Sequence, residues 1–148
     1  MTFWLSFLCV LSLDQISKWY VRSSFAIGES VPVLGPWLQL IYRENAGAAF
    51  GILPGGRWFF IGISLLSVGF AVFFYPKAYE FGWYSVVALG FVAGGALGNV
   101  IDRIHHETVT DFICIRYFPA VFNIADFAIV AGAFLSAITL LVHYQRMN

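Results

Sequence analysis

The sequence predicts an all-α membrane protein with four transmembrane helices and a small β element in its longest loop. Two observations lead to this fold class. First, 60% of the 148 residues are hydrophobic and 11% are charged, with a mean hydropathy of +0.81, whereas soluble domains carry about 25% charged residues. Second, long apolar runs recur along the chain and polar residues gather between them. We expect one domain over residues 1–148.

The four spans are predicted from the length of these runs, because a helix crosses the membrane core with about 20 apolar residues. The spans cover about 3–21, 58–76, 83–102 and 122–143. The first run is short, and a helix that enters at residue 2 rises only about 18 Å before it reaches Asp14. Asp14 is therefore expected inside the membrane. No Lys or Arg precedes this run, so it is not interpreted as a cleaved signal peptide.

Four spans place both termini on one side of the membrane and the loops at about 22–57 and 103–121 on the other side. Residues 76–82 are predicted to form a tight turn on the side of the termini. Apolar residues alternate in 30–42, which predicts a small β element. Most acids and most bases lie on the two-loop side, so a count of positive charges leaves the orientation open.

Small residues at four-residue spacing predict close packing between the third and fourth spans, because such residues let helix backbones approach each other in lipid. These residues are Gly90, Gly94 and Gly98, followed by Ala128, Gly132 and Ser136.

Ionisable side chains at membrane depth are costly, so each is a candidate for function. Asp14 and Lys18 are four residues apart and can pair on one helical face. Three further polar groups follow along the chain: Asn99, Asp102 and Arg103 at the end of the third span, Asp111 in the next loop, and Asn123 with Asp126 at the start of the fourth span.

Converging aspartates suggest acid–base hydrolysis, because two carboxyl groups about 3 Å apart cannot both ionise and must share a proton. One carboxylate can then deprotonate a water while its neutral partner donates to the carbonyl under attack. An equally simple interpretation is that these acids pair with Arg103, Lys18 or Arg116. The residues alone leave both interpretations open.

Other chemistries fit the sequence less well. His106-Glu107 begins like the zinc motif H-E-x-x-H, but Thr110 stands where the second His is required. Ser17 and Lys18 are neighbours and point about 100° apart on a helix, which disfavours a Ser–Lys peptidase. Cys9 and Cys114 are too far apart to form a disulfide. The net charge is zero, so no nucleic-acid partner is expected.

Four blocks of residues, which together extend over nearly the whole chain, resemble the lipoprotein signal peptidase family, also called signal peptidase II or prolipoprotein signal peptidase. The blocks are D-Q-I-S-K at 14–18, N-A-G-A-A-F at 45–50, G-G-A-L-G-N-V-I-D-R at 94–103 with V-T-D-F at 109–112, and F-N-I-A-D at 122–126.

The resemblance implies a multi-pass aspartic endopeptidase of the bacterial cytoplasmic, or inner, membrane. It implies cytoplasmic termini, an active site and β element near the extracytoplasmic face, and no metal or organic cofactor. The implied substrate is a prolipoprotein whose Cys carries diacylglycerol, and the cut falls just before that Cys. We expect a monomer whose other partner is membrane lipid.

The resemblance also implies roles for single residues. Asp111 and Asp126 match the catalytic pair, and Asp102, which spacing does not exclude as a catalytic acid, is expected to support the site. Asn45 and Arg103 match positions that hold the substrate main chain. Asn99 and Asn123 are expected to orient the carboxylates, while Asp14 and Lys18 secure the first helix against the site.

A non-enzymatic membrane carrier or scaffold with paired acids is the alternative function. A carrier normally shows two related halves, and the sequence contains no visible internal repeat.

Overall fold

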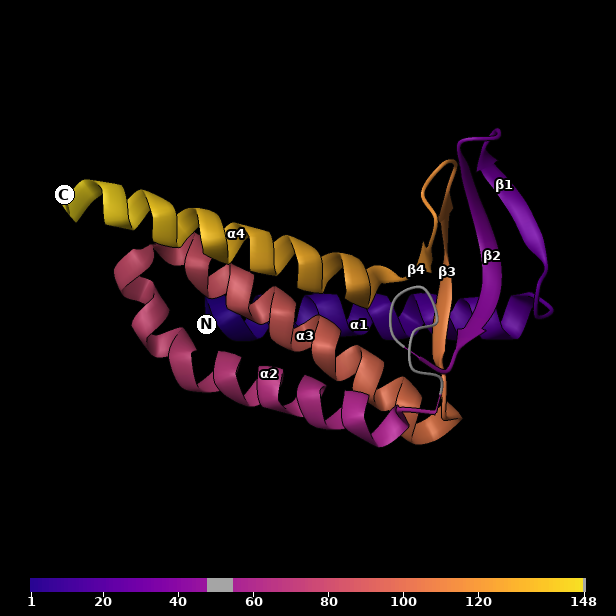
Figure 1. Cartoon of the computed structure of the whole chain (residues 1–148), viewed down its shortest axis with the longest axis horizontal. Coiled ribbons are helices and arrows are strands. Elements are labelled where there is room, and N and C mark those ends of the chain that lie inside the picture. The colour runs from indigo at the N-terminus through magenta and orange to yellow at the C-terminus, as the bar shows by residue number, and fades with distance from the viewer. Residues whose placement is uncertain (48–54, 148) are drawn as a thin grey trace.

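Four long helices run side by side, and a small sheet stands at one end of them (Figure 1). The computed structural model describes residues 1–47 and 55–147. The helices are α1 (Thr2–Ser24), α2 (Arg57–Ala78), α3 (Trp83–His106) and α4 (Ile124–Met147). Both ends of the chain lie at the end of the helices away from the sheet (Figure 1). Ala48, Ala49 and Phe50 of the N-A-G-A-A-F block lie outside the described residues.

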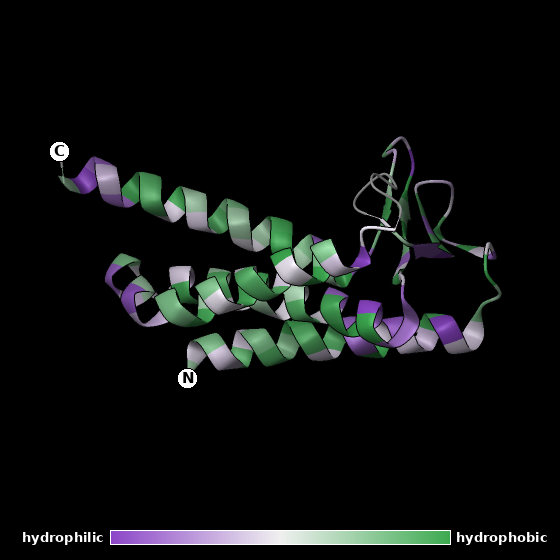
Figure 2. Cartoon of the chain, turned by 60° about the horizontal axis from the view of Figure 1, so that its bottom comes forward, coloured by the Kyte–Doolittle hydropathy of each residue, from purple (hydrophilic) through white to green (hydrophobic). Residues whose placement is uncertain are grey.

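Three of the described helical segments are long and apolar enough to cross a membrane: Arg57–Phe81, Trp83–His106 and Ile124–Met147. Hydrophobic residues cover the middle of the helices, and hydrophilic residues gather towards their ends (Figure 2). α1 has a comparable length but carries Asp14, Lys18 and Arg22 on one face. The protein is therefore mostly helical, with three apolar helices that match the second, third and fourth predicted spans.

The sheet contains four antiparallel strands in the order β1-β2-β3-β4. They are β1 (Ser30–Leu34), β2 (Leu38–Asn45), β3 (Val109–Ile115) and β4 (Val121–Phe122). The first two strands confirm the β element predicted at 30–42. The other two correct the prediction, because the second loop also forms strands and joins them to the first loop. A buried cluster of Val21, Tyr42 and Phe112 packs the sheet against α1.

The turn predicted at 76–82 is wrong in its first part. α2 continues through Pro76 to Ala78, and the 3₁₀ helix η2 (Tyr79–Phe81) then leads to Gly82. Pro lacks a backbone N–H and usually ends a helix, but here it stands in the last turn, where apolar packing of Ala78 in the core sustains the helix. All four helices also extend past the predicted span limits at their C-terminal ends.

Gly90, Gly94 and Gly98 of α3 face α1, which corrects the prediction that these three residues contact the fourth helix. A Cβ atom on Gly94 would lie 2.6 Å from the backbone oxygen of Phe7. A Cβ on Gly90 would overlap the hydroxyl of Ser6, and one on Gly98 would overlap the carboxylate of Asp14. The missing side chains therefore bring the backbone of α1 close to α3 and leave room for Asp14.

The predicted close packing of the third and fourth helices is confirmed. It uses Gly132 of α4, which was among the predicted residues, and Gly95 of α3, which was not. A Cβ on Gly95 would lie 2.5 Å from the backbone oxygen of Ala125, and a Cβ on Gly132 would lie 2.6 Å from that of Ala88. α3 thus packs closely against two helices at once, with Gly94 and Gly95 on different faces. This central position of α3 brings α1 and α4 to the same polar end.

Replacing Gly94 with Ala should weaken the α1–α3 contact, because the added methyl group meets backbone that cannot move aside. We expect Gly94→Ala to lower the free energy of unfolding by about 1–3 kcal/mol. Gly69→Ala in α2 is the matched control, since nothing lies within 4 Å of its added Cβ. Thermal unfolding in detergent tests this, and equal unfolding midpoints for the two variants would refute the close contact.

Candidate active site

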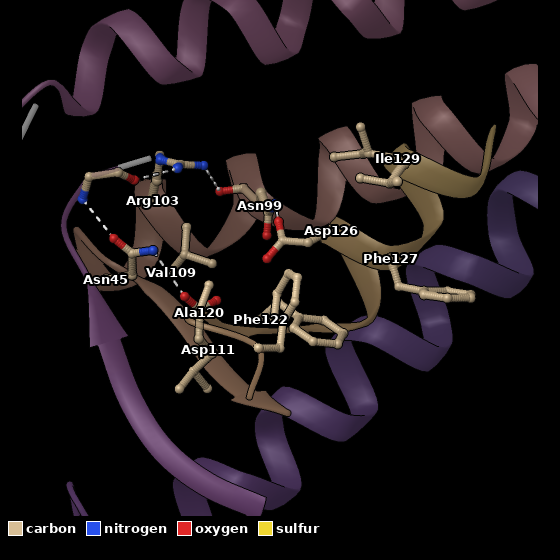
Figure 3. A pocket seen from close by; sticks show the side chains of 14 residues that line it. Asn45, Asn99, Arg103, Val109, Asp111, Ala120, Phe122, Asp126, Phe127 and Ile129 are labelled. Carbon is tan, nitrogen blue, oxygen red and sulfur yellow. Dashed lines mark hydrogen bonds between the residues drawn. The ribbon is translucent and has the colours of Figure 1, made fainter. Parts of the chain in front are cut away.

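A cavity of about 400 Å³ opens where the sheet meets the ends of α3 and α4. Five of the predicted site residues line it: Asn45, Asn99, Arg103, Asp111 and Asp126 (Figure 3). The rest of its wall is mostly apolar and comes from β3, β4, the segment between them and α4. These residues include Val109, Phe118, Ala120, Val121, Phe122, Phe127, Ile129 and Val130. The cavity therefore joins two carboxylates to a hydrophobic surface.

Strand alternation directs Asp111 into the cavity. Successive side chains of a strand point to opposite faces, so Val109 and Asp111 line the cavity while Thr110 and Phe112 face α1. Phe112 is buried in the cluster below the sheet and fixes the strand. Asp111 is 3% exposed although it borders the cavity, so its carboxyl group is largely removed from solvent.

Two amides from different elements hold the Asp111 carboxylate. Asn123 Nδ2 donates to Asp111 Oδ1 at 2.7 Å, and Asn45 Nδ2 donates to Asp111 Oδ2 at 2.9 Å. Asn45 reaches it diagonally, because Asn45 of β2 pairs with Val109 and shares the face of the sheet with Asp111. Both oxygens of the carboxylate are thus fixed in direction.

Asp126 is placed by the start of α4. Asn123 Oδ1 accepts the backbone N–H of Asp126 at 2.9 Å, and Asp126 Oδ2 accepts the backbone N–H of Asn123 at 3.3 Å. This reciprocal pair has the arrangement of a capping box, which satisfies backbone donors that the first turn leaves free. Asn99 Nδ2 donates to the other oxygen, Oδ1, at 2.8 Å. The half-buried Asp126 therefore keeps one fixed orientation.

The two carboxyl groups influence each other across the cavity. The pKa of Asp111 is raised from its ordinary value of 3.8 to about 7, chiefly by burial and next by the charge of Asp126. Its hydrogen bonds from the two Asn side chains act in the opposite direction. Near neutral pH the site can therefore hold one neutral acid beside one carboxylate, as general acid–base chemistry requires.

Asp102 lies behind this site, and it is not among the described residues that line the cavity. Its fully buried carboxylate lies 3.2 Å from Lys18 Nζ and 3.3 Å from Arg22 Nη1. It also accepts the backbone N–H of Thr110 at 3.0 Å. Asp102 therefore ties the end of α3 to α1 and to the strand that carries Asp111.

Asp14 and Lys18 form the predicted pair at 2.9 Å, and both side chains are fully buried. Asp14 Oδ1 also accepts the backbone N–H of Ala125 at 2.9 Å. An acid of α1 thus satisfies one of the free backbone donors in the first turn of α4, where negative charge is favoured. This bond fixes α1 against the helix that carries Asp126.

Arg103 lines the cavity beside Asn99. Its guanidinium donates to the backbone oxygens of Asn99 at 3.3 Å and Gly47 at 3.2 Å, and it lies 5.2 Å from the ring centre of Phe60. The group carries five donors in a rigid fork, and these two hydrogen bonds fix the direction of that fork.

Two features of the site were not predicted from the sequence: the role of Arg22 and the apolar wall of the cavity. Arg22 bridges Asp102 and Thr110, with 3.0 Å from its Nη1 to Thr110 Oγ1. The spacing of Asp14, Lys18 and Arg22 at four-residue intervals was the available signal, because such residues share one face of a helix. The apolar wall from the β3–β4 segment carried no comparable signal, since its position depends on strand pairing.

Among the described residues, no group of three His, Cys, Asp or Glu side chains is arranged to hold a metal ion. His105 and His106 are exposed at the end of α3. Thr110, which stands where the zinc motif requires its second His, is buried and contacts Arg22.

A family model described as signal peptidase (SPase) II matches residues 6–142. The chain belongs to the signal peptidase II family. It is 44% identical over 146 residues to the lipoprotein signal peptidase of Syntrophomonas wolfei subsp. wolfei. This alignment covers 99% of the chain and 97% of the relative. A lipoprotein signal peptidase of Desulfitobacterium hafniense is 37% identical with the same coverage. The predicted family is thus confirmed.

Solved structures agree with the fold of this signal peptidase II chain. A bacterial membrane enzyme determined at 2.3 Å resolution superposes with a TM-score of 0.93 at 33% identity, covering 99% of this chain and 92% of the other. A second bacterial membrane enzyme, determined at 1.9 Å resolution, gives a TM-score of 0.86 at 35% identity, with coverage of 95% and 92%. The arrangement of helices and sheet is therefore shared with known membrane enzymes.

The electrostatic coupling of the two acids in this signal peptidase II chain can be measured directly. Asp126→Asn removes the neighbouring charge, so the pKa of Asp111 should fall below about 7. It should stay above 3.8, because burial is the larger cause and is unchanged. An infrared pH titration of the neutral carboxyl band measures this, with Asp111→Asn identifying the band. An unchanged or raised midpoint in Asp126→Asn would contradict the coupling.

Proposed function

We propose that this chain is an aspartic endopeptidase that removes the signal peptide from diacylglyceryl-modified prolipoproteins by cutting just before the lipidated Cys. Membership of the signal peptidase II family and the named relatives support this activity. The observation that carries the proposal is the presence of Asp111 and Asp126 in one cavity, each held by amide donors. These two residues are the proposed catalytic pair.

In the proposed reaction the pair holds one proton. The ionised carboxylate takes a proton from a water molecule, and the oxygen of this water attacks the scissile carbonyl carbon. The neutral acid donates its proton to the carbonyl oxygen. In the collapse of the tetrahedral gem-diol intermediate, the C–N bond breaks and the proton that was taken from water passes to the leaving amine. A hydroxyl proton of the intermediate returns to the other carboxylate, which restores the starting state of the pair. The raised pKa of Asp111 supports this scheme, because it lets a neutral acid persist near neutral pH.

Other cavity residues receive supporting roles in this proposal. Asn99 and Asn123 orient the two carboxylates through the bonds at 2.8 and 2.7 Å. Asn45 and Arg103 hold the substrate main chain, since both combine a polar donor with a place in the cavity wall.

Residues outside the cavity wall support the site from behind. Asp102 anchors the strand of Asp111 through Thr110. Asp14 and Lys18 fix α1 to the start of α4 and the end of α3.

The proposed setting is the bacterial cytoplasmic membrane, crossed four times. α1 forms the first span, with its polar face directed at α3 rather than at lipid. The termini lie on the cytoplasmic side, and the sheet and cavity lie near the extracytoplasmic face. The apolar wall of the cavity suits a substrate that keeps its signal helix and acyl chains in lipid while the scissile bond meets the carboxylates. The chain acts as a monomer surrounded by membrane lipid.

Removing either proposed catalytic acid should abolish cleavage of a lipidated precursor, because Asn can neither accept nor donate the transferred proton. We expect Asp111→Asn and Asp126→Asn to lower kcat by about 10²- to 10⁴-fold, measured by gel analysis of the precursor and the mature product. Glu80→Gln at the opposite end of the helices is the control and should retain the full rate.

Asp102→Asn distinguishes the catalytic pair from the acid behind it. We expect a smaller loss than in either catalytic variant, because the amide side chain that replaces the carboxylate still offers an oxygen to the Thr110 N–H. Retained cleavage in both Asp111→Asn and Asp126→Asn would reject the peptidase mechanism, and loss confined to Asp102→Asn would move the catalytic role to Asp102.

A further inference from the structure

The ammonium group of Lys18 has three oxygen partners, which equals the number of its donors. It lies 2.9 Å from Asp14 Oδ2 and 3.2 Å from Asp102 Oδ2, and it donates to Asn99 Oδ1 at 2.9 Å. Lys18 is fully buried, as are both carboxylates. Two of these contacts neutralise charge, whereas the third goes to a neutral amide that belongs to the cavity.

The amide of Asn99 has one oxygen and one nitrogen, and the surroundings decide which way they point. Its oxygen accepts from Lys18 at 2.9 Å and from Asn123 Nδ2 at 3.4 Å. Its nitrogen donates to Asp126 Oδ1 at 2.8 Å. A flipped amide would place N–H groups against the ammonium, which has no acceptor, and would turn its oxygen towards the Asp126 carboxylate.

Ion pairing alone does not account for the position of Lys18. Asp14, Lys18, Arg22 and Asp102 together are neutral, and Arg22 already lies 3.3 Å from Asp102. A lysine that served only to neutralise these acids would not need to direct its remaining donor at Asn99. Its position therefore links the buried ion network of α1 to the amide that fixes Asp126.

We infer that Lys18 is a positioning residue for the reaction: it fixes the Asn99 amide so that the nitrogen of this amide donates to Asp126. This inference rests on the proposed function, in which Asp126 is one of the catalytic acids. Lys18 is not among the described residues that line the cavity, and its direct contact with the site is the hydrogen bond to Asn99. Its positive charge also lowers the pKa of Asp111, but only this hydrogen bond orients a group that contacts Asp126.

The test compares two variants. The first keeps the contact with Asn99 and leaves one buried positive charge unbalanced, and the second removes the contact and restores the balance. Asp14→Asn retains Lys18 and its bond to Asn99 and sets the reference rate. Asp14→Asn with Lys18→Met removes the acid and the base together, so no extra buried charge is left. We expect kcat of the double variant to be lower than that of Asp14→Asn by a further factor of about 10 to 100, the range known for partners that orient metal-binding side chains. KM should change less than about twofold, because no substrate contact is lost.

Equal kcat values for the two variants would overturn the inference and leave Lys18 as an ion-pair anchor only. Asp126→Asn in the same assay separates this failure from failure of the proposed function, which is rejected only if Asp126→Asn still cleaves. Thermal unfolding checks that both variants fold.

Solid-state NMR of the unmutated protein in lipid provides a measurement that needs no variant. The Asn99 amide nitrogen should lie closer to the Asp126 carboxyl carbon than to Lys18 Nζ. The reverse order of these two distances would overturn the inference.

Discussion

The site depends on the interactions of the buried Lys18 ammonium, because this group joins α1 to the end of α3 through Asp102 and Asn99 and holds Asp14 on its own helix. A buried ion pair stabilises a protein only when its remaining polar atoms are also satisfied. Here Asp14 accepts the Ala125 N–H of α4, and Asp102 accepts the Thr110 N–H of β3. These two bonds position the elements that carry Asp126 and Asp111.

The chemistry of the site follows from unequal environments for two similar acids. Asp111 is nearly buried, and burial is the main reason that its pKa is raised to about 7. Asp126 is more exposed and sits in the first turn of α4, where a helix favours negative charge. Two titratable groups whose surroundings differ in this way can divide the acid and base roles. The apolar wall of the cavity lowers the local dielectric constant, which strengthens the electrostatic interactions of the two acids.

The family, the three apolar helices and five cavity residues could be predicted because each depends on local sequence: a run of apolar residues or a contiguous motif. Features that depend on contacts between distant parts of the chain could not be predicted from the sequence. Gly90, Gly94 and Gly98 indicated a close helix contact but not that α1 is the partner. The strands β3 and β4 form because the second loop pairs with β2. The spacing of Arg22 indicated that it shares a face with Asp14 and Lys18, but its contact with Thr110 depends on where β3 lies. The amide orientation of Asn99 likewise depends on distant groups: Lys18 of α1, Asp126 of α4, and Asn123 just before α4.

The central claim is that Asp111 and Asp126 act together on one scissile bond. A crystal structure with a lipidated peptide whose scissile amide is replaced by a secondary alcohol tests this most directly, because the hydroxyl group occupies the place of the attacked carbonyl. The account predicts that this hydroxyl lies within hydrogen-bond distance of both carboxylates, with the acyl chains along the apolar wall. A hydroxyl that contacts Asp102, or only one of the two acids, would contradict it.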